Sequence, residues 1–158
     1  DVYKRQVPLY EQLELLKKNK VAVVCGILSG TLASLTGIFV LCMLFGFNHQ
    51  QYVTMLPKSI TTAIGIGISE ELGGIVTITV AVIIITGILG NVIADTVFHI
   101  FKIKNPLAKG LALGTASHAI GTARAIEMGP VEGEMSSLAV AVAGLLTVVF
   151  VSGFAQLI

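Results

Sequence analysis

The sequence predicts an all-α membrane protein, a polytopic helical bundle with two inverted-repeat segments that are each re-entrant or built from a broken helix. The first observation is composition: 54% of the 158 residues are hydrophobic and only 12% are charged, against roughly 25% charged residues in soluble domains. The second is a set of three uncharged runs, each long enough to cross a bilayer. The third is an internal repeat of a small, glycine-rich polar segment.

The first residues are expected to precede the membrane domain. The chain has no initiator Met, and Glu11 and Glu14 stand where a signal peptide needs an apolar region. We therefore expect a fragment, with residues 1–6 as foreign sequence at a cut end and residues 7–158 as the transmembrane domain. An amphipathic pattern over residues 8–20 is typical of an interfacial helix or a short cytoplasmic linker.

The first predicted span covers residues 21–47, which carry no charge and can cross a bilayer with some tilt. Gly26 and Gly30 within it are four residues apart, a pattern typical of close helix packing. Packing is favoured over a ligand contact for these glycines. Residues 48–52 are then predicted to form a neutral polar loop.

Glycine-interrupted segments alternate with the next two predicted spans. Residues 57–74 are too short and too polar for a simple span, whereas residues 75–94 are uncharged and long enough. A second interrupted segment covers residues 107–129, and residues 135–158 form the last uncharged run. The chain thus alternates a span with an interrupted segment.

The two interrupted segments share a motif at a constant separation of 56 residues, as from 63 to 119 and from 71 to 127. The matching pairs are Thr62-Ala63-Ile64-Gly65 with His118-Ala119-Ile120-Gly121, and Glu71-Leu72-Gly73 with Glu127-Met128-Gly129. Chance similarity is the alternative, but the shared acidic-x-Gly ending favours a repeat. Paired glycine-interrupted segments in a membrane protein indicate a transport site.

Two lysine clusters predict the orientation. They are Lys17, Lys18 and Lys20 before the first span, and Lys102, Lys104 and Lys109 after the second. The positive-inside rule places both clusters in the cytoplasm. Residues 57–74 then begin and end outside, whereas the second copy starts from the cytoplasmic side, so the repeat is inverted. The second copy either re-enters, which puts the C-terminus outside, or crosses, which puts it inside.

The repeat also supplies candidate binding residues. Non-helical backbone persists at membrane depth only where protein buries it or where it lines a watery cavity, and half-helix N-termini in such a cavity favour anions. The candidates are the hydroxyl side chains and glycines of both copies, with a histidine and an arginine of the second: Ser59, Thr61, Thr62, Gly65, Thr115, Ser117, His118, Gly121 and Arg124. This set suits a small carboxylate.

Structural roles compete with binding at three of the polar positions. His118 either gates an anion by titrating near neutrality or bonds to a neighbouring carbonyl. Arg124 binds substrate or, as the slightly favoured alternative, pairs with Glu127 three residues later. Lys58 either draws anions toward the outer mouth or, more commonly for such a residue, is an exposed interfacial lysine.

Other functional classes find little support in the sequence. It contains no metal-ligand spacing, nucleophile elbow or phosphate loop, so we expect neither an enzyme nor a metal or cofactor. The sequence also has no stripe of basic residues that would indicate nucleic-acid binding.

Four motifs occur in one order along the chain. They are Val7-Pro-Leu-Tyr10, Leu56-Pro-Lys-Ser-Ile-Thr-Thr62, Asn105-Pro-Leu-Ala-Lys-Gly-Leu-Ala-Leu-Gly-Thr-Ala-Ser-His118-Ala-Ile-Gly-Thr-Ala-Arg124, and Gly129-Pro-Val-Glu-Gly-Glu-Met135. Together they resemble the LrgB/CidB family of bacterial membrane proteins over about residues 7–158. Members of that family have further N-terminal spans that this chain lacks, which supports the prediction of a fragment.

The resemblance implies two functions. One is antiholin-like regulation of murein hydrolase export and cell lysis, with a small LrgA/CidA-type membrane partner. The other is transport of small carboxylates, pyruvate in bacteria and glycolate or glycerate in related plastid proteins. The repeat argues independently for transport, and the uniformly apolar spans are unlike the amphipathic spans of a large hole. We expect a multi-pass carboxylate transporter of the bacterial cell membrane, assembled as a homo-oligomer; the antiholin-like regulator is the alternative, and a purely structural membrane protein comes third.

Overall fold

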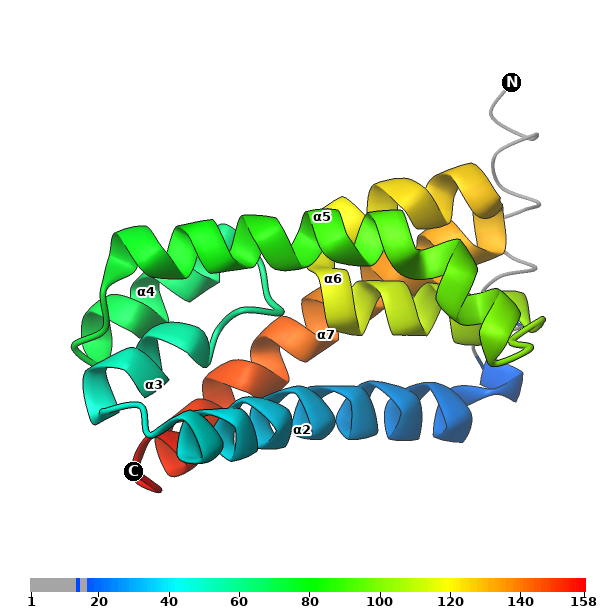
Figure 1. The fold of residues 1–158 in the computed structure, drawn as a ribbon. Helices are drawn as coiled ribbons and strands as arrows, with labels where there is room; N and C mark the ends of the chain where they lie inside the picture. Colours follow the sequence, from blue (N-terminus) through cyan, green and yellow to red (C-terminus); the bar gives the residue numbers. More distant parts are fainter. Residues whose placement is uncertain (1–13, 15–16) are drawn as a thin grey trace.

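The computed structural model describes residue 14 and residues 17–158, which form six helices joined by short connections (Figure 1). The helices are α2 (Lys20–Phe45), α3 (His49–Met55), α4 (Thr62–Glu71), α5 (Val76–Ile100), α6 (Pro106–Met128) and α7 (Pro130–Ala155). The all-α prediction is confirmed. The predictions for residues 1–6 and for most of residues 8–20 lie outside the described residues.

Within the described part of the chain, three helices are long and apolar enough to cross a membrane. They are α2, α5 and α7, with 26, 25 and 26 residues and a mean hydropathy of 2.1, 2.4 and 2.4. Each corresponds to a predicted span, but α5 continues past Asp95 to Ile100 and α7 starts at Pro130 rather than at residue 135. Charged side chains near a helix end can reach the interface, so they do not end the helix.

The first hairpin consists of α3, residues 56–61 and α4. The prediction of a loop at residues 48–52 is wrong, because α3 begins there. Asn48 caps this helix: its side chain accepts a hydrogen bond from the Gln51 amide at 2.9 Å, and the Gln51 side chain accepts one from the Asn48 amide at 3.0 Å. This reciprocal pair satisfies two amides that a helix start leaves free.

Tyr52 anchors the first hairpin. Its ring is fully buried and packs edge-on against Phe39 of α2, with ring centroids 6.2 Å apart. Its hydroxyl donates to the Phe154 carbonyl of α7 at 2.8 Å. Aliphatic side chains of α2, α7 and the hairpin complete this core: Leu35, Ile38, Val53, Leu56, Ile60, Ile68 and Val151.

The second hairpin is α6 itself, which doubles back on itself in Figure 1. The reversal is at His118, whose φ of 43° and ψ of −140° are not helical. A positive φ is costly for a residue with a side chain, so surrounding contacts must hold it. The second half of the helix returns to the end of α5, where Arg124 bonds to Asp95. The second copy therefore re-enters rather than crosses.

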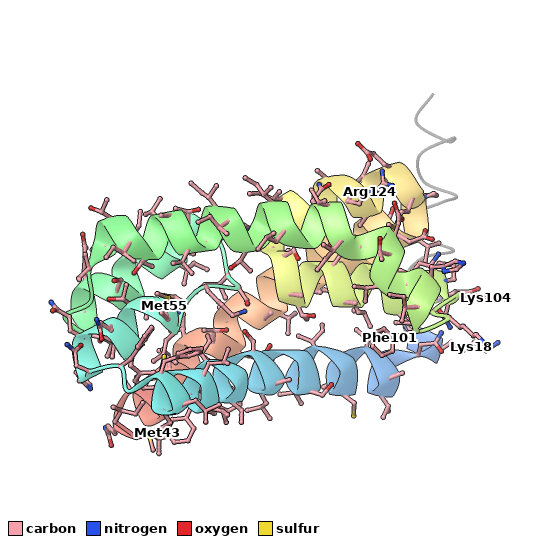
Figure 2. All side chains as sticks on the ribbon, viewed as in Figure 1. Lys18, Met43, Met55, Phe101, Lys104 and Arg124 are labelled. Atoms are coloured by element: carbon pink, nitrogen blue, oxygen red, sulfur yellow. The ribbon has the colours of Figure 1, made fainter. Side chains whose placement is uncertain are left out.

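The helix bundle has two ends, and each is marked by residues that project there or meet there. Lys18 and Lys104 project at one end, which we call the lysine end (Figure 2). At the opposite end, His49 Nδ1 lies 2.8 Å from the Ile158 carbonyl oxygen. Hence α2 and α7 run away from the lysine end, α5 runs toward it, and the hairpins enter from opposite ends.

The helix boundaries follow the interval of the sequence repeat. The starts of α2 and α5, at Lys20 and Val76, are 56 residues apart, and so are the start of α4 at Thr62 and the break at His118. One repeat unit is therefore a span followed by a hairpin. Because each unit contains a single crossing, the next unit starts from the other side of the membrane.

Glycines allow close packing of α6 on α2 and α7, two of its three long neighbours. A Cβ at Gly110 would lie 2.9 Å from the Met135 Cβ of α7, and one at Gly114 would lie 2.7 Å from the Ala139 Cβ. A Cβ at Gly30 of α2 would lie 3.0 Å from the Thr115 hydroxyl oxygen of α6. Such small-residue contacts are how helices approach closely inside a bilayer. The predicted packing role is seen at Gly30, whereas a Cβ at Gly26 would make only an ordinary contact with Leu111, and both glycines also line the groove described below.

Candidate functional site

The tips of the two hairpins meet on one stretch of α5. His118 Nε2 donates to the Ile83 carbonyl at 2.9 Å, which fixes the neutral ring as the Nε2–H tautomer. Gly65 of α4 packs against the side-chain end of the same Ile83. Gly87, one turn further along α5, leaves room for the His118 ring, whose Cε1 would lie 2.8 Å from an added Cβ. Two segments that enter from opposite ends thus converge within the bundle.

A groove of about 940 Å³ runs between α2 and the first half of α6. Asn19 and Asn105 line it near the lysine end, and Lys58 and Ser59 line it at the tip of the first hairpin. Between them the walls carry mainly small side chains: Ala22, Gly26, Ser29, Gly30, Ala33, Ser34, Ala108, Ala112, Thr115 and Ala116. The groove therefore connects the lysine end with the hairpin tip.

Lys58 is the charged group of this groove. Its Nζ donates to the Ser59 hydroxyl at 2.8 Å and lies 3.5 Å from the Ser34 hydroxyl, while the two hydroxyls are 2.9 Å apart. Among the described residues that line the groove it is the sole ionisable side chain, and it takes part in neither described ion pair. Ser34 lies near the middle of α2, so Lys58 stands at membrane depth. A charge there marks a functional site by default.

A second, much smaller cavity of about 10 Å³ lies beside the groove and shares Ser34, Ser59 and Thr115 with it. Thr31 and Thr147 add two further hydroxyls to its lining. Among the described residues, Thr31 Oγ1 is the one buried side-chain polar atom without a hydrogen-bond partner. This volume is about enough for one molecule of the size of water. The deep end of the groove therefore lies beside a small cavity whose described lining includes five hydroxyl side chains.

The structure brings only two of the predicted site residues to the groove, Ser59 and Thr115. Thr115 also donates to the Leu111 carbonyl at 2.8 Å, so its hydroxyl still has lone pairs to offer. Thr61 and Thr62 are half-buried at the start of α4, and the Thr61 side chain makes no capping bond there. Neither of them is among the described lining residues.

The tip residues of the second hairpin contact α5 and α6 rather than the groove. Ser117 is buried against Gly90 of α5, and Gly121 lies where an added Cβ would be 2.8 Å from the Leu113 carbonyl oxygen. His118 is buried and bonded to α5 as described above. Gly65 has the corresponding packing role in the first hairpin. These predicted binding residues hold the tips in place.

Arg124 lies at the lysine end in a cluster of three charges. It donates to Asp95 of α5 and, at 2.6 Å, to Glu127. The pairing with Glu127, the slightly favoured alternative, is confirmed, and Asp95 is an additional partner that the sequence analysis missed. Because two carboxylates already occupy the guanidinium, this geometry offers no basis for substrate binding by Arg124.

The residue that the sequence analysis undervalued is Lys58. A signal for it was present, because Lys58 is the one residue with a permanent charge between positions 48 and 69. A charge retained in an otherwise uncharged, glycine-rich segment at membrane depth is costly unless it serves a purpose. Its position after Pro57 suggested the interface, and only the hairpin geometry places it inside.

Comparisons with known proteins give the family. A sequence profile described as the LrgB-like family matches residues 6–157. The chain belongs to this family. It is 40% identical over 152 residues to "Antiholin-like protein LrgB" of Bacillus subtilis (strain 168), an alignment that covers 96% of this chain and 66% of that protein. A protein of the same name from Bacillus cereus (strain B4264) is 40% identical over 148 residues, with 94% and 64% covered.

The chain spans about two thirds of the length of these relatives. No solved structure matches it significantly. The predicted family is confirmed, and family membership together with three apolar helices makes this a helical membrane protein. The LrgB-like relatives are named as antiholin-like proteins and not as enzymes.

Proposed function

We propose that this LrgB-like chain forms part of a multi-pass transporter for small carboxylate anions in the bacterial cell membrane. The observation that carries the proposal is Lys58, an ammonium group at membrane depth that lines a groove and has no carboxylate partner among the described residues. A cation in such a place is stabilised by an anion that enters from solution. A small carboxylate has the charge and the acceptor oxygens that the ammonium needs.

The neighbours of Lys58 supply the rest of an anion site. The Ser34 and Ser59 hydroxyls lie within hydrogen-bond reach of its Nζ, and either can turn its proton toward a carboxylate oxygen. Hydrogen bonds that involve a charged group contribute about 1.5–3 kcal/mol each. One ammonium with two hydroxyls is therefore sufficient to hold a small anion, and the small side chains along the groove leave it a path to the lysine end.

The inverted hairpins support transport over simple binding. In several transporter folds, two inverted repeats meet near the midplane, and movement of one against the other opens the site to each side in turn. Here both tips contact Ile83 of α5. The lysine is on the first tip, so motion of this hairpin against α5 would expose the site first to one side of the membrane and then to the other.

The test is uptake of a radiolabelled small carboxylate by liposomes that contain the purified protein, with release of an entrapped dye measured in parallel. Transport predicts saturable uptake without dye release, and Lys58→Gln should reduce uptake strongly. The matched control is Lys104→Gln, which removes an exposed lysine at the lysine end. Equal loss in both variants, or uptake that parallels dye release, would contradict the proposal.

The second candidate is antiholin-like regulation of murein hydrolase export and cell lysis, acting with a small LrgA/CidA-type membrane partner. The names of the relatives favour it more directly than they favour transport. It predicts that the protein alters the leak of large solutes or the rate of lysis when its partner is present. Dye release that depends on the partner and is insensitive to Lys58→Gln would support this candidate over the first.

A further inference from the structure

We propose that the site transports one proton with each carboxylate anion, and that Lys58 is the group that carries the proton. This inference rests on the proposed function and adds the identity of the coupling ion. It follows from the composition of the groove around Lys58 and from its depth.

Among the described residues that line the groove, none other than Lys58 carries a charge, so none can balance an ammonium there. The face of α2 that lines the groove presents Asn19, Ser29 and Ser34, and α6 presents Asn105 and Thr115. None of these side chains titrates, and the contribution of α7 to the described lining is Val131. The nearest other titratable group at the tips, His118, is bonded to the Ile83 carbonyl of α5 instead. Within the described part of the chain no carboxylate balances Lys58, so an anion that enters the groove can do so.

The physical consequence is a coupling between two ligands. An ammonium that is withdrawn from water without a partner is strongly disfavoured, and so is a carboxylate at the same depth, whereas the two together form a neutral pair. The anion therefore binds best to the protonated lysine, and by linkage the proton binds best when the anion is present. The empty groove favours the neutral amine for the return step.

One transport cycle takes up one proton and one anion on the entry side and releases both on the exit side. On the entry side, the lone pair of the Lys58 amine takes one proton from water, and the carboxylate binds the resulting ammonium. On the exit side, the anion leaves and the proton returns to water, which regenerates the amine. One proton and one anion cross together, so each cycle moves no net charge and follows the proton gradient rather than the membrane voltage.

A sodium ion is a poor alternative in this site. The small cavity has the hydroxyl oxygens that a cation might use, but two of them, on Ser34 and Ser59, are already hydrogen-bonded to Lys58 or within its reach. A cation in the cavity would lie next to the ammonium, and two like charges at such separations repel strongly away from water. The cavity is better suited to a neutral oxygen atom, which can form a hydrogen bond with the Thr31 hydroxyl.

The experiment uses two assays on the same liposomes, with pyruvate as the probe. Exchange of labelled for unlabelled pyruvate, with equal pH on both sides, reports transport itself. Net accumulation driven by a lumen one pH unit more alkaline reports coupling, and one proton per anion predicts about tenfold accumulation. A pH-sensitive dye in the lumen records the proton, and protein-free liposomes correct for diffusion of the uncharged acid.

Lys58→Arg keeps a positive charge that cannot be released, because a guanidinium stays protonated in proteins. We expect slower exchange in this variant, and the exchange that remains should no longer be driven by the pH gradient. Lys104→Arg is the matched control and should keep both activities. His118→Gln should also keep coupling, because His118 does not line the groove among the described residues.

The outcomes separate the two proposals. Absence of exchange in the unmodified protein would overturn the proposed function. Exchange without pH-driven accumulation, or accumulation that requires sodium, would overturn only the proton inference. Proton-driven uptake that persists in Lys58→Arg, or coupling that is lost in His118→Gln while exchange remains, would overturn the role of Lys58. If Lys58→Arg does not fold, two other results still test the inference. The pH-sensitive dye shows whether the unmodified protein carries protons with pyruvate, and His118→Gln shows whether His118 is the coupling group instead.

Discussion

The two hairpins have the same position in the repeat but differ in how their tips are built. The first turns through residues 56–61, and this longer loop presents Lys58 and Ser59 to the groove. The second turns within one helix, at His118, and its tip packs against α5. One hairpin therefore carries the chemical groups, and the other is a compact support. The two copies share one architecture, and a lysine that lines the groove is found in the first of them.

The difference arises from what each tip packs against. An added Cβ at Gly121 in the second hairpin would lie 2.6 Å from the Ser117 Cβ and 2.8 Å from the Leu113 carbonyl oxygen. The corresponding Gly65 in the first hairpin faces the flexible end of the Ile83 side chain. Both Gly121 contacts lie within α6, so they fix the turn itself, and the second tip is tied to α5 by the His118 hydrogen bond to the Ile83 carbonyl. The two tips therefore meet α5 in different ways, one through a side chain and the other through a hydrogen bond to the backbone.

The strongest test of this division replaces the titratable side chain at each tip, one at a time, with glutamine. Lys58→Gln should raise the half-saturation concentration for pyruvate about tenfold to a hundredfold, because a hydrogen bond to a charged group contributes about 1.5–3 kcal/mol. His118→Gln, which retains a donor for the Ile83 carbonyl, should change it little. Uptake kinetics in liposomes measure both values. A larger effect at His118 than at Lys58 would reverse the roles assigned to the hairpins.

A second test compares the equivalent glycines. Gly121→Ala should destabilise the protein by about 1–3 kcal/mol, the usual cost of overpacking, because its neighbours include a backbone carbonyl. Gly65→Ala should cost less, because the Ile83 side chain can rotate away. Thermal unfolding in detergent, followed by the loss of monodisperse protein in size-exclusion chromatography, ranks the two. Equal destabilisation would show that both tips are held with the same rigidity.

The small cavity behind the first tip offers a third, weaker test. Thr31→Val keeps the shape of the side chain and removes a buried hydroxyl that has no partner in the described structure. We expect unchanged or higher stability, by up to about 1 kcal/mol, together with weaker pyruvate binding if the hydroxyl meets a substrate oxygen. Unfolding and uptake on the same preparation measure both. A marked loss of stability would mean that this hydroxyl already has a structural role.

The smallest effect is expected at the charged end of the second hairpin. Arg124→Ala removes exposed ion pairs with Asp95 and Glu127, which solvent and salt screen. Uptake kinetics should be close to those of the unmodified protein, with at most a slight decrease in thermal stability at low salt. A tenfold rise in the half-saturation concentration would instead restore Arg124 as a binding residue.

The sequence predicted the architecture well because its signals are strong ones. Long uncharged runs fix the spans, and the constant interval of 56 residues locates both hairpins. It did not decide whether the second copy re-enters, because that depends on a single backbone angle at His118. The helix α3 was missed because its Asn48 and Gln51 cap resembles a polar loop in composition.

The site was harder to predict than the fold. His118 and Arg124 attracted attention because histidine and arginine are conspicuous in an apolar chain, yet both have partners on α5. Those partners, Ile83 and Asp95, are 35 and 29 residues distant, and no spacing rule connects them. Lys58 shows the opposite problem, because a lysine without a nearby carboxylate looks the same in sequence whether it is exposed or enclosed.

The anchor of the first hairpin has a consequence for synthesis of the protein. The Tyr52 hydroxyl binds the Phe154 carbonyl across 102 residues, so this contact cannot form until Phe154 has left the ribosome. Chains emerge at about 5–20 residues per second, which leaves the first hairpin for several seconds or more without its final support. The second hairpin, packed on adjacent helices, can close earlier. The Tyr52 anchor should therefore be among the last contacts of the described bundle to form.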